Sequence, residues 1–275
     1  MPELPEVEVA RRLIEPEIVD RTITDAICRT ERLRWPLDPQ LAKKIRDRRL
    51  VAVRRRGKYL LLECVTQRET GWLIIHLGMS GSVRIAPART PAAKHDHFDL
   101  TLGDRLLRLH DPRRFGAVIW HPGPAPEAHP LLASLGPEPF DPRIDGRWLY
   151  EQLARRHGPI KPALMDSHLI VGIGNIYASE SLFRAGISPL RAAHRISAVR
   201  CERLLTEARA TLHESIQAGG SSLRDYVHAD GGLGCFQTRC AVYERAGESC
   251  LRCGGTIRQI RQSGRSTYFC PGCQT

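Results

Sequence analysis

The first residues of the chain have the types and spacing that amine catalysis requires. Removal of Met1 would expose the secondary amine of Pro2. The α-amino class titrates at about 7.7 to 8.0, so an appreciable fraction of such an amine is uncharged near neutral pH. A secondary amine can attack the anomeric carbon of a sugar and form an iminium ion, which eases elimination at the neighbouring carbon. Pro2 is therefore a candidate nucleophile, with Glu3 and Glu6 placed to move protons.

A helix must position these residues. Pro5 suits the first turn of a helix, and the apolar residues between Val7 and Ile14 recur at helical spacing, with a stop expected before Pro16. Carboxylates at the start of that helix would be favoured by its dipole. The same start is also compatible with a helix that is merely capped, so composition alone does not establish catalysis.

Four cysteines form a second pattern that carries chemistry. Two Cys-x2-Cys pairs are separated by 16 residues, at Cys250, Cys253, Cys270 and Cys273. This spacing is typical of a four-cysteine zinc ribbon, in which thiolates surround Zn2+ tetrahedrally. We expect one Zn2+ with a structural role, because a closed thiolate shell leaves no position for a catalytic water.

The other five cysteines show no such pattern. An intracellular location argues against a disulfide framework. We expect these five cysteines to be buried or half-buried and to pack as small hydrophobic side chains: Cys28, Cys64, Cys201, Cys235 and Cys240. Cys235 and Cys240 are close enough in sequence for a second metal or redox pair, but no further ligands accompany them.

The composition favours a polyanion-binding protein, and no membrane partner is expected. The 275-residue chain is 42% hydrophobic, with a formal net charge of +11 and a pI of about 9.5. Residues 29–58 carry twelve basic and three acidic side chains. Nucleic acid is the expected partner, with acidic lipid or simple solubility as the alternatives. No apolar run approaches the roughly 18 residues of a membrane span. The acidic, proline-broken start excludes a secretory signal, so a cytoplasmic, nucleoid-associated location is expected.

A β-rich part is expected in the first half of the chain. Six short segments with many β-forming residues are separated largely by turn signals, at 59–64, 72–77, 81–85, 98–102, 105–110 and 117–120. Residues 98–102 alternate between apolar and polar side chains, and Gly103-Asp104 is a tight hairpin signal. An antiparallel sandwich or flattened barrel would close such a set of strands.

The second half of the chain has a different pattern. Residues 121–143 contain seven prolines, which is typical of a linker at a domain boundary. Helical spacing follows at 147–157, 176–185 and 198–218, where Gly219-Gly220 ends the last helix. Residues 221–234 are glycine-rich and polar, which favours a loop.

Together these motifs resemble the formamidopyrimidine-DNA glycosylase family over essentially the whole chain. The matching segments are MPELPEVE at 1–8, RRRGKYLLLE at 54–63, HLGMSGS at 76–82, KHDHFD at 94–99, DPRRFGA at 111–117, LGPEP at 135–139, IKPALMD at 160–166, VGIGNIYASESLFRAGI at 171–187 and the ribbon. The resemblance implies a multidomain α+β fold: an N-terminal catalytic antiparallel β-sandwich with a leading helix, then a helix-two-turn-helix domain and the four-cysteine zinc ribbon. We expect the catalytic domain at 1–135, a linker at 136–146 and the zinc ribbon at 235–275. The helix-two-turn-helix domain is expected at 147–234, with a lesion-recognition loop at 221–234.

The resemblance also implies a bifunctional DNA glycosylase and AP lyase of base excision repair. Such an enzyme would excise oxidised purines, namely 8-oxoguanine and formamidopyrimidines, and cleave the strand by β,δ-elimination through an iminium on Pro2. Glu3 would be the general acid and base, with Glu6 as a supporting carboxylate. Lys58 would contact phosphate near the lesion or the base itself, and only five of the 41 basic residues are lysines. Arg265 would complete the catalytic set from the minor groove.

The same resemblance implies that the target nucleotide is flipped out of the duplex, because an amine cannot reach a base inside it. Met79, Arg113 and Phe115 would fill the void, although a Met or Phe after a strand more often belongs to a core. Further DNA contacts are implied for His76, His95, Arg114, Lys161 and Asn175. The turn at 172–177 offers glycine amides and a helix N-terminus to phosphate. The expected partner is double-stranded DNA that contains oxidised bases or abasic sites, bound by a monomer.

Two other functions stay open at this point. An endonuclease VIII-like glycosylase would act on oxidised pyrimidines, but such chains typically begin PEGPE, whereas Leu4 stands here. A non-catalytic zinc-ribbon DNA-binding protein would not need Pro2. The chain also departs from the family pattern near the start of the ribbon, at Cys235, Cys240 and Glu244.

Overall fold

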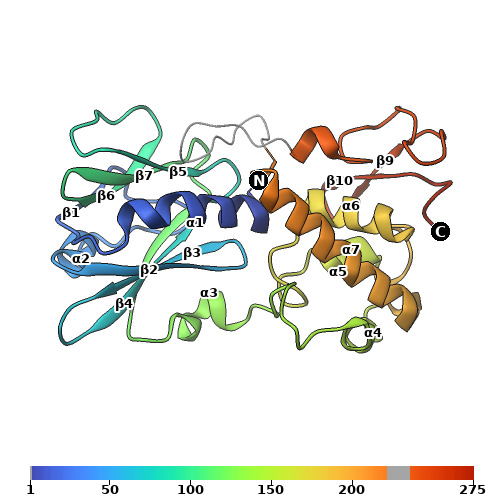
Figure 1. The fold of residues 1–275 in the computed structure, drawn as a ribbon, viewed down its shortest axis with the longest axis horizontal. Coiled ribbons are helices and arrows are strands. Elements are labelled where there is room, and N and C mark those ends of the chain that lie inside the picture. The colour runs from blue at the N-terminus through green and yellow to red at the C-terminus, as the bar shows by residue number, and fades with distance from the viewer. Residues whose placement is uncertain (1, 222–235) are drawn as a thin grey trace. The chain divides into compact units, whose positions relative to one another are not determined.

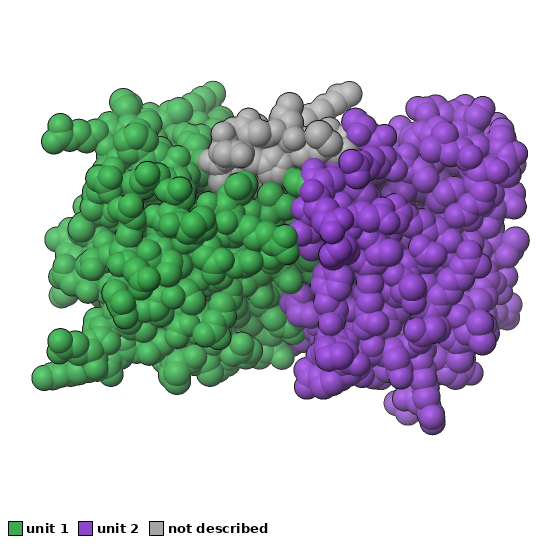
Figure 2. All heavy atoms as spheres, viewed as in Figure 1, with its two compact units in different colours: residues 1–133, 219–234 green, residues 134–218, 235–275 purple. Residues whose placement is uncertain are grey.

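The computed structural model describes residues 2–221 and 236–275, which belong to two compact units (Figure 2). Among these residues, unit 1 contains 2–133 and 219–221, and unit 2 contains 134–218 and 236–275. Within the same described ranges, no helix combines the length and the apolar character that crossing a membrane requires.

A long helix, α1 (Leu4–Ile18), leads unit 1 and starts after the N-cap residue Glu3. The prediction that this helix stops before Pro16 is wrong, because Pro16 lies inside its last turn. A proline removes one backbone hydrogen bond from a helix. Here the amide of Val19 still bonds one turn back (3.0 Å), and Ile18 is fully buried. Burial of that side chain offsets the missing bond.

Two antiparallel four-stranded sheets form a sandwich in the described part of unit 1 (Figure 1). The first sheet has the order β2 (Arg49–Arg56), β3 (Tyr59–Val65), β4 (Thr70–His76) and β8 (Ala117–Pro122). The second has the order β1 (Asp25–Cys28), β6 (Asp96–Leu102), β7 (Arg105–His110) and β5 (Ser82–Pro87). Apolar side chains of both sheets and of α1 share one buried core. The predicted sandwich is confirmed, including the hairpin at Gly103-Asp104 between β6 and β7.

Strands β1 and β2 lie outside the six segments that the sequence indicated. In β2 the core residues Leu50 and Val53 are three positions apart, because a bulge shifts the register between Leu50 and Ala52. The bulge breaks the alternation by which a half-buried strand is recognised. β1 is an edge strand, and Cys28 at its end is exposed, which corrects the expectation of a buried or half-buried thiol. The short helix α2 (Leu41–Ile45) was likewise not predicted.

Three connections gather at one end of the sandwich because the strands are antiparallel. β3 starts, β4 ends and β8 starts at this end. The turn at 57–58 and the connections 77–81 and 111–116 therefore lie together, and we call them the loop end. The start of α1 points the same way: Glu8 bonds Arg55 near the end of β2 (3.0 Å), whereas the chain just after α1 bonds the start of β2.

Helices are the main regular elements of unit 2 as described (Figure 1). They are α4 (Gly146–Leu153), α5 (Ile160–Leu164), α6 (Asn175–Ala185) and α7 (Ala198–Gln217), with short 3-10 turns η2 (Ala193–Arg195) and η3 (Phe236–Arg239). Buried leucines of α7 pack against α4 and α6. Strands β9 (Arg258–Gln262) and β10 (Arg265–Phe269) form the final hairpin. The three predicted helices are confirmed with shifted ends, and the proline-rich segment contains η1 (Pro126–Ala128) and α3 (Pro130–Ala133).

Candidate functional site

Two buried carboxylates flank the start of α1. Glu3, which adjoins the buried Pro2, is 2% exposed, and Glu6 is 1% exposed. One Glu6 oxygen accepts the backbone amide of Glu3 (2.8 Å), and the other accepts the amide (2.8 Å) and hydroxyl (3.0 Å) of Ser221. Gly220 has a φ of 80°, and a β-carbon there would lie only 3.2 Å from Glu6. Glu6 is thus held in place by both of its oxygens, whereas the role of Glu3 as a general acid and base stays a prediction.

Glu8 is a third carboxylate near this start, but its bonds give it a different role. It accepts hydrogen bonds from Arg11, Arg12 and Arg55, with the closest at 2.8 Å. Burial would raise the pKa of Glu8, but the hydrogen bonds from Arg11 and Arg12 and the charge of Arg55 outweigh it and lower the pKa to about 2. A carboxyl group with that pKa stays ionised near neutral pH and fastens α1 to β2.

Lys58 and His76 meet at the loop end. Lys58 follows Gly57 in the turn before β3, and His76 ends β4. Desolvation, followed by the charges of Lys58 and Arg34, lowers the pKa of His76 to about 4. Its Nδ1 accepts the amide of Gly78 (3.0 Å), so the remaining proton lies on Nε2. His76 can therefore donate a hydrogen bond to phosphate from an uncharged ring.

The three predicted void-filling residues lie in two loop-end connections. Met79 is 40% exposed and Phe115 is 43% exposed. The guanidinium of Arg113 lies 5.0 Å from the centre of the Phe115 ring. Because Met79 and Phe115 face outward, neither is the core residue that a Met or Phe after a strand usually is.

His95 and Arg114 belong to neighbouring segments of the same end. Both have left-handed backbones, with φ of 73° and 55°. The carbonyl of His95 accepts the amide of Asp111 (2.9 Å), and the amide of Arg114 donates to the carbonyl of Asp111 (3.2 Å). Arg114 is exposed and His95 is half-buried, so both predicted DNA contacts remain sterically available.

Lys161 and Asn175 come together in unit 2, but around protein acceptors. Lys161 is 1% exposed, and its ammonium donates to Asn175 (2.6 Å), to Thr267 (2.7 Å) and to the carbonyl of Ser266 (3.0 Å). Asn175 donates to the same carbonyl (3.0 Å). Both residues thus hold the start of β10, directly after the exposed Arg265. Their direct phosphate contacts remain predictions.

Glu180 is a residue to which sequence spacing assigns no role. It is fully buried on α6 and accepts the backbone amides of Ala241, Val242 and Tyr243, at 2.8 to 2.9 Å. This carboxylate fastens the entry of the ribbon to α6. The only signal in the sequence is a carboxylate among the small and apolar residues of a helix, which does not reveal its distant partners.

The four ribbon cysteines converge as zinc ligands do. Their sulfurs all lie within 4.8 Å of one another, with 3.8 Å between Cys250 and Cys273 and 3.4 Å between Cys253 and Cys270. Tetrahedral thiolates at about 2.3 Å from zinc are separated by about 3.8 Å, so the residues fit one structural Zn2+. Cys240 is buried and its thiol approaches a backbone carbonyl, whereas Cys235 lies outside the described residues.

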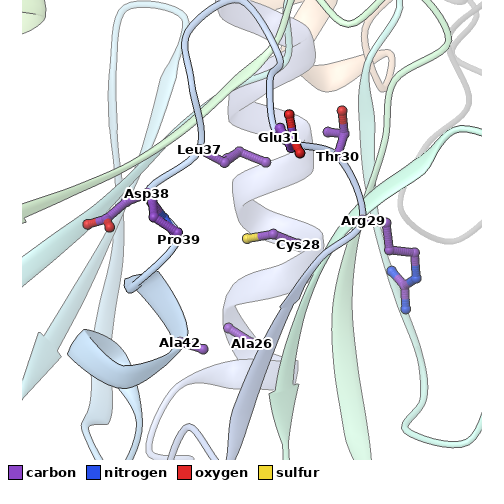
Figure 3. Close-up of a pocket in the computed structure, with 9 residues that line it drawn as sticks. All are labelled: Ala26, Cys28, Arg29, Thr30, Glu31, Leu37, Asp38, Pro39 and Ala42. Atoms are coloured by element: carbon purple, nitrogen blue, oxygen red, sulfur yellow. The ribbon is translucent and has the colours of Figure 1, made fainter.

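A cavity of about 630 Å³ lies elsewhere in unit 1, beside β1 (Figure 3). Its lining residues are Ala26, Cys28, Arg29, Thr30, Glu31, Leu37, Asp38, Pro39 and Ala42. Desolvation and the charge of Asp38 raise the pKa of Cys28, so its thiol stays protonated and is a poor nucleophile. No predicted site residue lines this cavity.

Comparison with known proteins gives matches along most of the chain. The formamidopyrimidine-DNA glycosylase N-terminal domain matches residues 1–118, the formamidopyrimidine-DNA glycosylase H2TH domain matches 135–227, and a zinc finger found in FPG and IleRS matches 247–275. The chain is 61% identical to a formamidopyrimidine-DNA glycosylase of Dechloromonas aromatica (strain RCB) and 53% identical to one of Burkholderia cenocepacia (strain HI2424), each over 100% of both chains.

Solved structures give the same result. MutM (FPG) from Thermus thermophilus has a TM-score of 0.88 and 37% identity, and the match covers 99% of this chain and 98% of that one. Lactococcus lactis Fpg in complex with DNA containing an abasic site has a TM-score of 0.89 and 34% identity, with 99% of both chains covered.

Proposed function

The chain belongs to the formamidopyrimidine-DNA glycosylase family, and from this membership we propose that it excises oxidised purines, namely 8-oxoguanine and formamidopyrimidines, from duplex DNA and then cleaves the strand. One observation carries the proposal. The buried start of α1, with Pro2 and Glu3, points to the same end of the sandwich as the exposed side chains of Met79 and Phe115. A nucleophile and a means of entering a base stack therefore share one end of one unit.

The chemistry starts when Met1 has been removed and the Pro2 nitrogen is an amine. This nitrogen attacks C1′ of the damaged nucleotide, the glycosidic bond breaks, and the base leaves with the bond's electron pair and a proton. The nitrogen then loses its own proton, and its lone pair expels O4′, which takes up a proton, so the sugar ring opens and an iminium forms at C1′. This iminium draws electrons from the C2′–H bond, so loss of that proton expels the 3′ phosphate, and a second elimination expels the 5′ phosphate. Glu3, beside Pro2 and buried, carries the protons.

Extrusion of the base gives roles to the remaining loop-end residues. Met79 and Phe115 enter the stack where the flipped nucleotide has left, and Arg113 hydrogen-bonds the unpaired opposite base, preferably cytosine. Lys58, His95 and Arg114 bind phosphates around the lesion. Arg265 binds from the ribbon, in the minor groove beside the lesion. Lys161 and Asn175 serve that contact by holding β10.

Borohydride trapping tests the proposal. A duplex with 8-oxoguanine opposite cytosine should become covalently attached to the protein, because borohydride reduces the iminium to a stable amine. A Pro2→Gly variant should bind the same duplex but lose most turnover. Mass measurement of the N-terminal peptide verifies that Met1 is absent.

Each alternative function gives a different trapping result. Failure of trapping by protein with a verified Pro2 N-terminus would support a non-catalytic zinc-ribbon DNA-binding protein. Trapping on oxidised pyrimidines in preference to 8-oxoguanine would support an endonuclease VIII-like glycosylase.

A further inference from the structure

One buried carboxylate joins the two connections that carry Met79 and Phe115. Asp111 is fully buried. Its Oδ1 accepts the hydroxyl of Ser80 (3.3 Å), the residue after Met79. Its Oδ2 accepts the backbone amide of Gly116 (2.7 Å), the residue after Phe115. A single side chain therefore bridges the two connections directly beside their exposed apolar residues.

The backbones of the two connections also interlock. Gly78 has a φ of 68°, and a β-carbon on it would lie 2.4 Å from the carbonyl carbon of Phe115 and 2.5 Å from the nitrogen of Gly116. A β-carbon on Gly116 would lie 2.8 Å from the carbonyl oxygen of His76. Only glycine permits approaches this close. The connections thus form one unit, from which Met79 and Phe115 project.

The bonding of Asp111 differs from that of the other buried aspartates of the sandwich. Asp96 and Asp99 pair with arginines, including Arg108 at 3.5 and 2.7 Å. Within the described residues, no lysine or arginine forms an ion pair with Asp111. Its two oxygens instead accept one hydrogen bond from each connection.

We propose that Asp111 is a positioning residue that holds Met79 and Phe115 as one preformed wedge for base extrusion. This inference rests on the proposed function, because it assigns Asp111 to one step of that reaction. A wedge that is ordered before DNA arrives loses little conformational freedom when it enters the base stack. Asp111 therefore speeds the flipping of a stacked nucleotide and is not needed for chemistry on an unstacked one.

An Asp111→Asn variant separates these two steps. The asparagine keeps one acceptor oxygen, but its amide group cannot accept the second hydrogen bond. In single-turnover assays we expect base excision from an 8-oxoguanine duplex to slow by about 10- to 100-fold, because a buried donor is left without its acceptor. Cleavage of a single-stranded oligonucleotide with an abasic site should be unchanged, because no stack has to be filled.

Two further variants keep the test decisive. Asp104→Asn makes the same substitution in the hairpin at the opposite end of the sandwich and should change neither rate. Ser80→Ala removes only the hydroxyl bond and should slow the duplex reaction less, also without effect on the single strand. Ser80→Ala decides the question if Asp111→Asn does not fold, as judged by circular dichroism.

A double-mutant cycle distinguishes positioning from general destabilisation. If Asp111 acts through Met79, the losses from Asp111→Asn and Met79→Ala on duplex DNA are not additive. Additive losses, or equal losses on duplex and single strand, would overturn the inference. A wild-type protein that cleaves neither substrate would instead overturn the proposed function, and this inference with it.

Discussion

The Glu6 carboxylate accepts hydrogen bonds from the backbone amide (2.8 Å) and the hydroxyl (3.0 Å) of Ser221, a residue 215 positions further along the chain. The other Glu6 oxygen accepts the amide of Glu3 (2.8 Å). The start of α1 is thereby tied to the first residue of the predicted lesion-recognition loop, whose residues 222–234 lie outside the described ranges. Hydrogen bonds of one side chain thus connect the predicted site of chemistry with Ser221.

A Glu6→Gln variant should lower the free energy of unfolding by about 1 to 3 kcal/mol, because its amide group leaves a buried donor without an acceptor. Urea unfolding followed by circular dichroism measures this loss. Glu15→Gln is the matched control on the same helix, since Glu15 is 40% exposed in its pair with Arg11. Loss of that exposed pair should cost less than about 1 kcal/mol. Equal losses in the two variants would contradict a special role for Glu6.

His76 should make stability depend on pH. Desolvation and the nearby charges of Lys58 and Arg34 lower its pKa from 6.5 to about 4. Between those values the unfolded state binds the proton more strongly than the folded state. The contribution of uncharged His76 to the free energy of unfolding is therefore fully present above about pH 6.5. It is lost as pH falls towards 4, and the loss amounts to about 3 kcal/mol at most.

The matched variant is His76→Gln, whose side-chain oxygen can accept the Gly78 amide but does not titrate. Urea unfolding at pH 7 and pH 5 gives the change in stability for each protein. The wild type should lose more stability than His76→Gln between these two values. The same loss in both proteins would show that His76 is not the titrating group.

Loss of zinc should unfold the ribbon and weaken DNA binding. Cys270 is fully buried and packs with Phe183, Val242 and Ile257, so metal binding and folding of this small core are coupled. A chelator or a Cys270→Ser substitution should lower affinity for lesion duplex in a fluorescence anisotropy titration, with the Pro2 amine chemically intact. Cys28→Ser, at an exposed thiol outside the ribbon, is the control. Full affinity without metal would argue against this role of the ribbon.

Salt dependence should distinguish Arg265 from Lys161. Arg265→Ala removes an exposed cation, so the slope of log affinity against log salt should fall by about 1. Lys161→Met should reduce affinity with little change in slope, because the Lys161 ammonium is already held by Asn175, Thr267 and Ser266. If the slope instead fell by about 1 for Lys161→Met, Lys161 would make a direct phosphate contact.

Local patterns predicted most of the elements. Short runs of β-forming residues between turn signals predicted six of the strands, helical spacing predicted α1, α4, α6 and α7, and the cysteine spacing predicted the ribbon. The failures have causes outside the local sequence: the bulge at Leu50 hides β2, and burial of Ile18 carries α1 past Pro16. In both places a tertiary contact overrides the preference of the neighbouring residues.

The sequence by itself determined the chemical groups of this protein: a proline at position 2 followed by two carboxylates, a strongly basic composition and four zinc ligands. Such features depend on residue types and short spacings. Only the tertiary structure decided which groups are buried and what they bond, because hydrogen bonds between distant segments exist only once the chain has folded. It gave Glu6 its partner Ser221, surrounded Lys161 with protein acceptors, and set Asp111 between the connections of Met79 and Phe115.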